Sequence, residues 1–477
     1  MAKPRLVIPF SLHFSVRYVL RSGLLRRLRE FANPVVMLGW KDAELESELR
    51  DEGAEVHPLM EAHWGRSYQR WRSYVNLWHV KRLGSPSAGV WERRADLSRT
   101  LTQRWRRRAR RKIFEAGFAV PNSITWLLNR ERKLFWADTN ARQVLGQAES
   151  LEADAALSLT PFLPGEEAIL RAFATKGIPM CASILSFDNI TTRGWIPIDF
   201  DRYLVWNSYN ARELMKVYSA ATRENIDIVG SPQFDFYRDP TYVWEETVWR
   251  RRMKLPAKGS VILLGGGFYT CAPHEPQFLL QLDQAVERKE LPEDTVILFR
   301  NHPLDPIERW RPVLSQTKHT VHDDPTPEGR ISGRTNIRRA DIEKLASCLY
   351  HSKVHVNVAS TMAVDGAIFD RPQVGPAYDD TPGQKWDRSS KELYQQEHYL
   401  PITNSGGLNI VYSRTELIRA VREGLENPER LASGRRRLLQ EICTFDDGRA
   451  TERTARSVHS FIERAVGERQ ERIEYTA

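Results

Sequence analysis

Cysteine is scarce in this chain of 477 residues. The four cysteines lie far apart in the sequence, and none of them forms a CxxC pair. Structural zinc sites commonly use closely spaced cysteine pairs and disulfide frameworks are dense in cysteine, so the sequence favours neither. The scarcity is typical of a protein in a reducing compartment. The cysteines are Cys181, Cys271, Cys348 and Cys443.

Long apolar runs are absent as well. No window approaches the roughly 18 consecutive apolar residues that a transmembrane helix needs. The apolar run near the N-terminus is short and is interrupted by His13 and Arg17, which is not typical of a signal peptide. We therefore expect a cytoplasmic protein, with peripheral attachment to the inner face of the cell membrane as a further expectation.

Acidic residues are scarce in one segment of the chain. The formal net charge is +9. Residues 62–136 contain 18 Lys/Arg and 4 Asp/Glu, a local charge of +14, so the remainder carries a charge of −5. Such a local excess predicts an anionic partner for that segment. The chain is also too long for one hydrophobic core, which predicts two domains.

The order of apolar runs and helical periodicities predicts an α/β fold. A β-α-β-α-β pattern opens the chain over residues 5–59, resumes near residue 154, and is followed by a second α/β pattern from residue 260. The first strand is expected over 5–10 and the first helix over 19–31, and the second pattern includes expected helices over 305–317 and 414–426. This order predicts two parallel, doubly wound sheets of the Rossmann type. Ligands of such sheets bind beyond the carboxyl ends of the strands, so we expect a site in a cleft between two facing domains.

Composition shifts place the expected boundaries. The N-terminal domain is expected over 1–253, the C-terminal domain over 254–445 and a final helix over 446–477. A helical, basic insert is expected to interrupt the first domain over about residues 60–150.

Three loops of the second domain are candidates for a phosphate site. Each follows an expected strand, so parallel pairing would bring all three to one edge of the sheet. Glycine lets backbone N–H groups approach a ligand, and a histidine before proline is held in extended backbone. A Ser/Thr corner at the start of a helix offers further N–H groups to a phosphate. The residues are Gly265, Gly266, Gly267, Asn301, His302, Ser360, Thr361 and Asp365.

Each of these residues also has a purely structural interpretation. Ser360 can cap the helix that begins after it, and Asp365 can be a solvated helix residue. A single histidine such as His302 more often has a structural role than a catalytic one. The joint occurrence of the three loops favours a site for nucleotide phosphates, with no metal or cofactor expected.

Two of these motifs resemble a known family. RNHP (300–303) followed by VASTMAVDGAIFDRP (358–372) resembles the nucleotide-binding half of GT-B glycosyltransferases, in particular bacterial sialyl- and Kdo-transferases and polyol-phosphate polymerases. The series FDNITTRG (187–194), VWN (205–207) and VGSPQFD (229–235) resembles bacterial surface-carbohydrate biosynthesis proteins.

The resemblance implies roles for four residues of the second domain. His302 would contact the donor phosphate and assist departure of the leaving group. Ser360 and Thr361 would hold the same phosphates, and Asp365 would occupy the ribose or sugar position. The chain departs from the commonest pattern with Thr361 in place of a second serine and with Phe187 in place of tryptophan.

Inverting glycosyl transfer also needs a base for the acceptor hydroxyl. Asp188 follows a strand of the first domain and is the first candidate, and His13 is the second. An Asx turn is the structural alternative for Asp188, and a loop residue that hydrogen-bonds its own backbone is the alternative for His13. The residues expected to meet the acceptor are Arg17, Asn189, Thr191 and Thr192.

Two acidic pairs are not expected to bind metal. Asp199 and Asp201 form a DxD pattern, but they precede an expected strand and so lie away from the carboxyl edge of the sheet. Asp323 and Asp324 are expected in an ordinary loop.

The insert is rich in tryptophan and arginine. Trp64, Trp71 and Trp78 recur every seven residues and so share one helix face, which fits either packing onto the first domain or a membrane interface. The run RWRRRARRK (104–112) favours an anionic partner, with a membrane surface ahead of nucleic acid because no nucleic-acid module is recognisable.

We therefore expect a metal-independent GT-B glycosyltransferase of bacterial surface polysaccharide assembly. The donor would be a nucleotide sugar and the acceptor a saccharide. The basic insert favours a saccharide that is linked to a lipid. Two other catalytic interpretations share the fold, a polyol-phosphate transferase of the CDP-glycerol type and a sugar-nucleotide 2-epimerase. A non-catalytic binding or scaffold protein is the alternative from another class.

Overall fold

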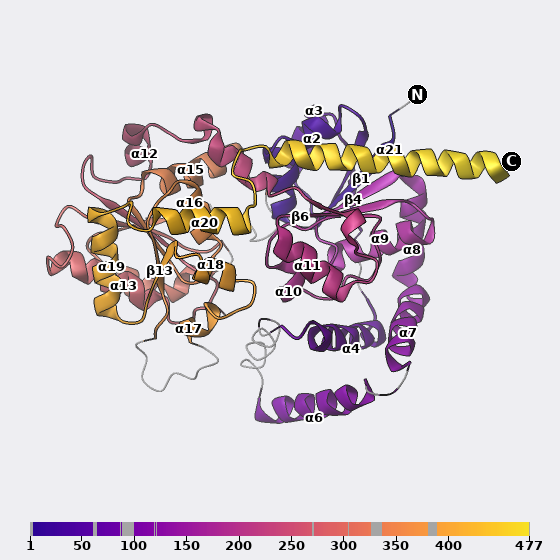
Figure 1. Ribbon diagram of the computed structural model, residues 1–477, viewed down its shortest axis with the longest axis horizontal. Helices are drawn as coiled ribbons and strands as arrows, with labels where there is room; N and C mark the ends of the chain where they lie inside the picture. Colours follow the sequence, from indigo (N-terminus) through magenta and orange to yellow (C-terminus); the bar gives the residue numbers. More distant parts are fainter. Residues whose placement is uncertain are drawn as a thin grey trace. The chain divides into compact units, whose positions relative to one another are not determined.

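The computed structural model describes residues 3–60, 64–85, 87, 100–118, 120, 122–269, 271–303, 305–325, 336–379 and 389–476. The chain forms two compact units (Figure 1). Unit 1 comprises Met1–Pro232 together with Ala450–Ala477, and unit 2 comprises Gln233–Arg449. Residues 233–253 therefore belong to unit 2, whereas the sequence placed them in the first domain. The expected two-domain α/β class is confirmed.

Unit 1 is built on a seven-stranded sheet in which every neighbouring pair of strands is parallel. The strand order is β3-β2-β1-β4-β5-β6-β7, so the direction of winding reverses between β1 and β4. Doubly wound sheets bind their ligands at such a reversal. The strands are β1 (Arg5–Phe10), β2 (Asn33–Leu38), β3 (Glu55–Pro58), β4 (Ala155–Ser158), β5 (Met180–Ser183), β6 (Arg202–Val205) and β7 (Ile226–Ile228).

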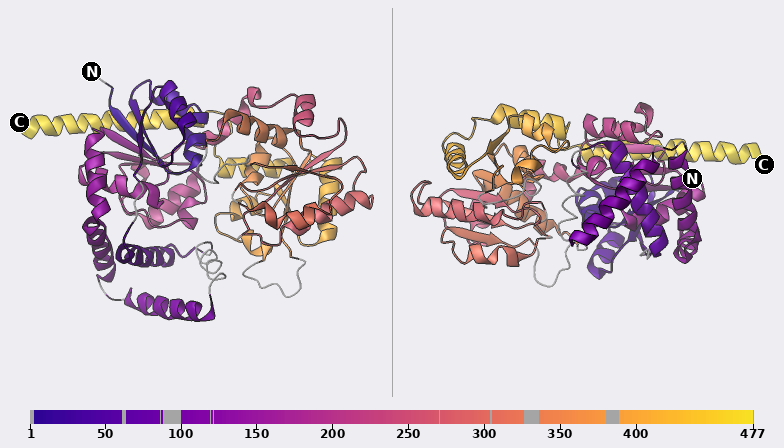
Figure 2. Two further views of the ribbon diagram at one scale, coloured as in Figure 1. Left: turned by 180° about the vertical axis from the view of Figure 1, so that it is seen from behind. Right: turned by 90° about the horizontal axis from the view of Figure 1, so that it is seen from below.

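Helices cover both faces of this sheet. Because side chains alternate along a strand, β1 contributes residues to the core on each face. Val7 packs in a core with the helices α8 (Thr139–Ser150), α9 (Pro164–Thr175) and α11 (Ser208–Val217). Leu6 and Ile8 pack in the opposite core with α2 (Leu24–Leu28), α3 (Ala43–Asp51) and α21 (Ala450–Thr476). The C-terminal helix α21 thus returns to unit 1 and lies along α2 (Figure 2).

Unit 2 contains a six-stranded parallel sheet with the order β10-β9-β8-β11-β12-β13. The winding reverses between β8 and β11. The strands are β8 (Val261–Gly265), β9 (Val296–Arg300), β10 (Thr320–Asp323), β11 (Val354–Asn357), β12 (Gln373–Pro376) and β13 (Leu408–Val411). The helices are α12 (Glu246–Arg252), α13 (Pro276–Glu287), α14 (Arg311–Leu314), α15 (Arg339–His351), α16 (Met362–Ile368), α17 (Ser390–Leu393), α18 (Leu400–Asn404), α19 (Arg414–Glu426) and α20 (Ala432–Ile442).

The insert of unit 1 is helical, as expected. Residues 88–99 lie outside the described part of the chain. Besides α8, its described helices are α4 (Arg66–Leu83), α6 (Leu101–Gly117) and α7 (Ser123–Ala137). Trp64 and Trp78 are buried, and Trp71 packs edge-on against Trp126 with ring centroids 5.2 Å apart. The regularly spaced tryptophans therefore pack within unit 1.

Buried charges attach the insert to helix α9. Arg171 Nη2 lies 2.6 Å from Glu131 Oε1 on α7 and 2.8 Å from Glu167 Oε1 within α9. The Tyr68 hydroxyl on α4 donates to Glu167 Oε1 at 2.5 Å. Burial alone would raise the pKa of Glu167, but the guanidinium groups of Arg72 and Arg171 hold it below its ordinary value. The two insert helices are thus tied to the sheet layer through paired buried charges.

The first crossover differs from the single helix expected over residues 19–31. A short helix α1 (His13–Ser15) leads into a π-helical segment, η1 (Val16–Arg21). Gly23 then adopts a φ of +79° and begins α2. Because a positive φ is accessible to glycine at little cost, the chain turns there and the helix is split.

The interpretation of Asp323 as a loop residue was wrong. Asp323 ends β10 and is buried, with ion pairs to Arg300 of β9 and to Lys344. These cations keep the pKa of Asp323 below its ordinary value although burial alone would raise it.

The remaining short segments are η2 (Arg223–Asn225), α10 (Asn189–Thr192), η3 (Pro232–Arg238), η4 (Pro240–Tyr242) and η5 (Ile307–Arg309). None of the described helices has an apolar stretch long enough to span a membrane.

Candidate functional site

The three candidate loops of unit 2 begin at the same level of the sheet. Gly265 at the end of β8 is the register partner of Arg300 on β9 and of Asn357 on β11. The loops after these strands therefore leave the carboxyl edge side by side. The glycine loop and the Ser360 corner also flank the reversal of winding, where doubly wound sheets bind ligands.

Two of the three glycines are needed because other groups approach closely. A Cβ on Gly266 would lie 3.0 Å from the Trp310 ring and 3.3 Å from the Asn301 Cα. A Cβ on Gly265 would overlap the sulfur of Met362, which follows the Ser360 corner. The Gly266 N–H donates to the Arg300 carbonyl at 2.8 Å. The sequence thus allows close packing of the three loops at these glycines.

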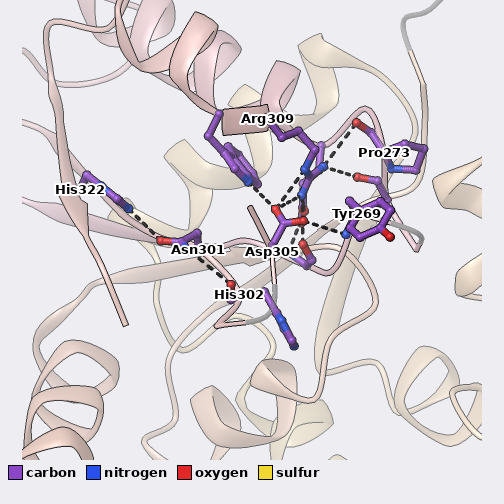
Figure 3. A network of polar contacts seen from close by, with 11 residues as sticks. Tyr269, Pro273, Asn301, His302, Asp305, Arg309 and His322 are labelled. Carbon is purple, nitrogen blue, oxygen red and sulfur yellow. Dashed lines mark hydrogen bonds and ion pairs between the residues drawn. The ribbon is translucent and has the colours of Figure 1, made fainter. Parts of the chain in front are cut away.

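Asp305 connects the glycine loop to the histidine loop (Figure 3). Its N–H donates to the His302 carbonyl at 2.9 Å, and its Oδ1 accepts from the Tyr269 N–H at 2.9 Å. Its Oδ2 accepts from Trp310 Nε1 at 2.6 Å and from Arg309 Nη2 at 2.6 Å. Asp305 was not a candidate in the sequence, because an Asp beside a proline is a common turn signal.

Arg309 continues this network into the glycine loop. It donates to the carbonyl of Gly267 at 3.0 Å and to the carbonyl of Ala272 at 2.7 Å. The ring of His302 points away from Asp305 and Arg309 (Figure 3) and lies 5.9 Å from the ring of Phe268. The backbone of His302 is therefore fixed by the network while its partly exposed imidazole faces elsewhere.

Glu275 is a buried carboxyl group beneath the glycine loop. Its Oε2 accepts from the Gly267 N–H at 2.7 Å and lies 3.6 Å from Arg309 Nη2. Burial raises the pKa of Glu275 to about 7, although Arg309 acts in the opposite direction. The glycine loop therefore lies on a group that changes charge near neutral pH. Glu275 was not a candidate in the sequence, because it lies in the turn before a helix and matches no motif.

Ser360 and Thr361 form the corner between β11 and α16. Ser360 Oγ accepts from the Met362 N–H at 3.2 Å, and the carbonyls of Ser360 and Thr361 accept from Ala363 and Val364 at 3.1 and 2.9 Å. Several N–H groups at the start of this seven-residue helix are thus already bonded. The N-cap of α16 is Thr361, so Ser360 lies one residue before the cap and binds the first N–H of the helix, while the exposed Thr361 reaches the same edge.

Asp365 is buried rather than solvated. It is 7% exposed, and its Oδ1 accepts from the Tyr237 hydroxyl at 2.7 Å. Tyr237 belongs to η3, which includes part of the SPQFD motif. The segment that follows the VGSPQFD motif therefore contacts the helix after the Ser360 corner within unit 2. The contact gives Asp365 a structural partner, and its role toward a donor remains a prediction.

The candidates of unit 1 lie after β1 and after β5. His13 is buried at the start of α1, and Arg17 lies in η1. The Tyr18 hydroxyl is 2.8 Å from Ser183 Oγ at the end of β5, which connects this segment to the strand before Asp188. His13 is therefore a helix residue, although a loop position was expected for it.

Asp188 organises its own turn. Its Oδ2 accepts from the Thr192 hydroxyl at 3.1 Å, and its Oδ1 accepts from Asn189 Nδ2 at 3.2 Å. Its carbonyl accepts from the hydroxyls of Thr191 and Thr192. The hydrogen bonds from Asn189 and Thr192 orient the half-buried carboxylate of Asp188. Because Asn189, Thr191 and Thr192 already donate to Asp188, they are less suited to hold an acceptor.

A second buried carboxyl group, Glu166, was also missed in the sequence. It accepts from Ser158 Oγ at 2.6 Å and from the Thr160 N–H at 3.1 Å, and Ser11 Oγ lies 3.2 Å from it. Burial raises the pKa of Glu166, although these hydrogen bonds oppose the shift. Glu166 thereby joins the loops after β1 and β4 at the reversal of winding in unit 1.

Residues 187–460 match the sequence model of a family described as CDP-Glycerol:Poly(glycerophosphate) glycerophosphotransferase. The chain belongs to this glycerophosphotransferase family. The match covers more than half of the chain and includes Asp188 and all three loops of unit 2. It begins at Phe187, the first residue of FDNITTRG, so the basic insert lies outside it. Membership of the family makes this protein a transferase. No match to a curated protein was found.

Solved structures show the fold of this glycerophosphotransferase family member. The S. aureus MnaA-UDP co-structure is 10% identical, covers 96% of this chain and 97% of its own, and has a TM-score of 0.56. UDP-GlcNAc 2-epimerase from Neisseria meningitidis bound to UDP-GlcNAc is 10% identical, covers 96% of this chain and 99% of its own, and has a TM-score of 0.54. A glycosyltransferase from Rickettsia africae is 10% identical, covers 97% of this chain and 99% of its own, and has a TM-score of 0.50. The fold is therefore GT-B-like.

One acidic residue of the DxD pattern, Asp201, has a structural partner in this glycerophosphotransferase family member. Asp201 Oδ2 accepts from the Met180 N–H at 2.8 Å before β6 begins. In the part of the chain that the structure describes, no group of three or more His, Cys, Asp or Glu side chains is placed to hold a metal ion. Metal independence remains a prediction.

Proposed function

We propose that this protein transfers a polyol phosphate from a CDP-activated donor to a saccharide acceptor of bacterial surface polysaccharide. The family match over residues 187–460 carries the donor class, because the family is described by CDP-glycerol. We place the reaction in the cytoplasm, where the sequence leads us to expect the protein, and we propose a lipid-linked acceptor.

We assign the donor to the strand-end loops of unit 2. Gly266 and Gly267 bring backbone close to the carboxyl edge, and Thr361 reaches the same edge from the other side of the reversal. The imidazole of His302 extends from a backbone that Asp305 fixes, so it can contact the donor phosphate. A protonated imidazole stabilises charge that develops on a departing phosphate, which favours His302 as the leaving-group residue.

We assign the acceptor to the strand-end loops of unit 1. Asp188 is our first candidate for the base, because Thr192 and Asn189 hold its carboxylate in one orientation. His13 is the second candidate. In the proposed step the acceptor oxygen forms a bond to the phosphorus that carries the polyol. The bond from that phosphorus to the bridging oxygen breaks, CMP leaves, and the acceptor proton passes to the base.

Glycosyl transfer from a nucleotide sugar is the second candidate function. The FDNITTRG, VWN and VGSPQFD series favours it, because that series resembles surface-carbohydrate biosynthesis proteins. In this alternative the acceptor oxygen attacks the anomeric carbon and the nucleotide leaves with its phosphate. The two reactions differ in one product property, because only polyol-phosphate transfer adds phosphorus to the acceptor.

A turnover assay with phosphorus-labelled donors tests the proposal. CDP-glycerol and CDP-ribitol, labelled in the phosphate next to the polyol, are compared with CMP-, UDP-, GDP-, CDP- and dTDP-sugars on a saccharide acceptor. We expect label in the acceptor from a CDP-polyol and about 10²–10⁴-fold lower turnover in His302→Gln. Sugar incorporation without phosphorus would favour the second candidate, and full activity of His302→Gln would contradict the assignment of His302.

A further inference from the structure

Helix α6 (Leu101–Gly117) is a helix of unit 1 with no buried residue. It lies beyond α4, on the side away from the sheet (Figures 1 and 2). One side of α6 contacts α4, where Phe114 stacks on Tyr74 with ring centroids 3.6 Å apart. The residues on that side, at positions 104, 107, 111, 114 and 115, are all partly buried.

The opposite side of α6 carries a row of large apolar side chains. Leu101 is 76% exposed, Trp105 is 75% exposed and Ile113 is 72% exposed. At 100° per residue these three positions fall within one third of the helix circumference, and two alanines lie between them. Exposed apolar side chains gathered on one face mark a surface that binds something.

Basic side chains border this apolar row. The helix contains seven Lys/Arg and one Glu, and that Glu115 is paired with Arg111 at 2.6 Å. The basic side chains exposed around the outer face are Arg106, Arg108, Arg110 and Lys112. An apolar strip with cationic borders is complementary to a surface that has anionic headgroups above an apolar interior.

We propose that the outer face of α6 docks on an anionic lipid bilayer. Leu101, Trp105 and Ile113 enter the boundary between headgroups and acyl chains, and the bordering cations meet lipid phosphates. Leu101 and Ile113 argue against a nucleic acid, because aliphatic side chains cannot stack on bases as aromatic ones do. The proposal goes beyond the transfer reaction and does not depend on the identity of the donor.

The structure also shows which tryptophans of the insert are not available to a membrane. Trp64 and Trp78 are buried, and Trp71 packs against Trp126 and Phe114, so the regularly spaced tryptophans are not the docking residues. The α4 helix that supports α6 is tied to α9 through the Tyr68–Glu167 hydrogen bond. In the part of the insert that the structure describes, the outer face of α6 gathers Leu101, Trp105 and Ile113 among exposed cations, whereas the exposed Trp126 packs against Trp71.

Vesicle flotation of the full chain tests this proposal. Vesicles of phosphatidylcholine alone are compared with vesicles that contain 30 mol% phosphatidylglycerol, a composition of about one third anionic lipid. We expect binding to the anionic vesicles, and at least about tenfold weaker binding after Leu101→Ser, Trp105→Ser and Ile113→Ser are combined. We expect a similar loss after Arg106→Gln, Arg108→Gln, Arg110→Gln and Lys112→Gln are combined.

A matched control removes the same charge elsewhere. The combination Arg251→Gln, Lys258→Gln, Arg288→Gln and Arg419→Gln changes four exposed residues of unit 2 and should leave vesicle binding unchanged. Circular dichroism and thermal melting confirm that each variant is folded, which is expected because the changed side chains are exposed. Equal binding to neutral and anionic vesicles, or unchanged binding of both α6 variants, would overturn the proposal.

One further outcome separates lipid from other polyanions. If the charge variant loses binding and the apolar variant keeps it, α6 recognises negative charge without insertion, and the proposed entry of Leu101, Trp105 and Ile113 into the bilayer is overturned. Donor-dependent turnover of each α6 variant in solution is measured in parallel. A variant that loses vesicle binding and retains turnover shows that α6 acts in membrane binding and not in the proposed reaction, so the two proposals are tested separately.

Discussion

The protonation of Glu275, the buried carboxyl group beneath the glycine loop, should make the free energy of unfolding depend on pH. Because burial raises its pKa to about 7 in the folded protein, the folded state binds a proton between about pH 4.5 and 7 that the unfolded chain releases. The stability that protonated Glu275 provides is therefore complete below pH 4.5 and is lost as the pH rises toward 7.

We expect Glu275→Gln to remove this pH dependence. Relative to the wild type, the variant should gain about 3 kcal/mol of unfolding free energy between pH 5 and pH 8, an order-of-magnitude figure from 1.36 kcal/mol per unit of pKa. Urea denaturation of both proteins at the two pH values measures the difference. A parallel pH dependence in wild type and variant would show that Glu275 keeps an ordinary pKa.

At the scale of elements, strands were predicted well because buried parallel strands are short apolar runs. The predicted strand over 5–10 is exact, and so is the helix over 414–426, whose N-cap Ser413 accepts from the Glu416 N–H. The expected helix over 305–317 is instead a 3₁₀ turn and the short helix α14, because Pro312 lacks the N–H that the interior of a continuous helix would need.

The candidate site was predicted where backbone geometry creates a local signal. The glycines lie at the end of β8 and directly after it, and the His-Pro step follows β9, as expected. Asp305 and Glu275 could not be found in this way, because their partners Tyr269 and Gly267 are recognised only once the chain has folded. Whether these loops bind a donor remains a prediction.

The buried ion pairs of the insert predict a local loss of stability. Replacing Arg171 by Leu leaves Glu131 and Glu167 buried with Arg72 as their remaining shared cation, at 3.8 Å and 3.4 Å, which should cost about 3 kcal/mol. We expect faster proteolysis within α7 and faster amide exchange there. Arg132→Leu changes an exposed arginine of the same helix and should leave both rates close to those of the wild type.

Resistance of the Arg171 variant to proteolysis would show that apolar packing alone holds the insert. That packing is substantial, because Trp64 and Phe135 lie within the same core with ring centroids 4.6 Å apart.

At the scale of the whole molecule, the return of α21 makes the C-terminus part of unit 1. Val458, Phe461 and Ile462 pack in the core beneath α2 and α3, and Arg453 donates to the Val229 carbonyl at 3.1 Å. Truncation after Arg449 removes these side chains, and at about 1.5–3 kcal/mol each it should cost unit 1 on the order of 5 kcal/mol.

Hydrogen exchange locates that effect. We expect exchange to accelerate in β1 and α2 and to stay unchanged in β8 and β11 of unit 2. Removal of residues 468–477 keeps the packing residues and serves as the control. Equal acceleration in both units would mean that α21 supports the whole chain rather than unit 1.

The central claim is that the strand-end loops of unit 2 bind a nucleotide-activated donor. Hydrogen exchange with and without saturating CDP-glycerol, and with each nucleotide sugar in turn, tests it most directly. We predict that one donor class slows exchange in the loops that contain Gly266, His302 and Thr361, while β2 and β3 of unit 1 are unaffected. Protection confined to other segments, or none with any donor, would contradict the claim.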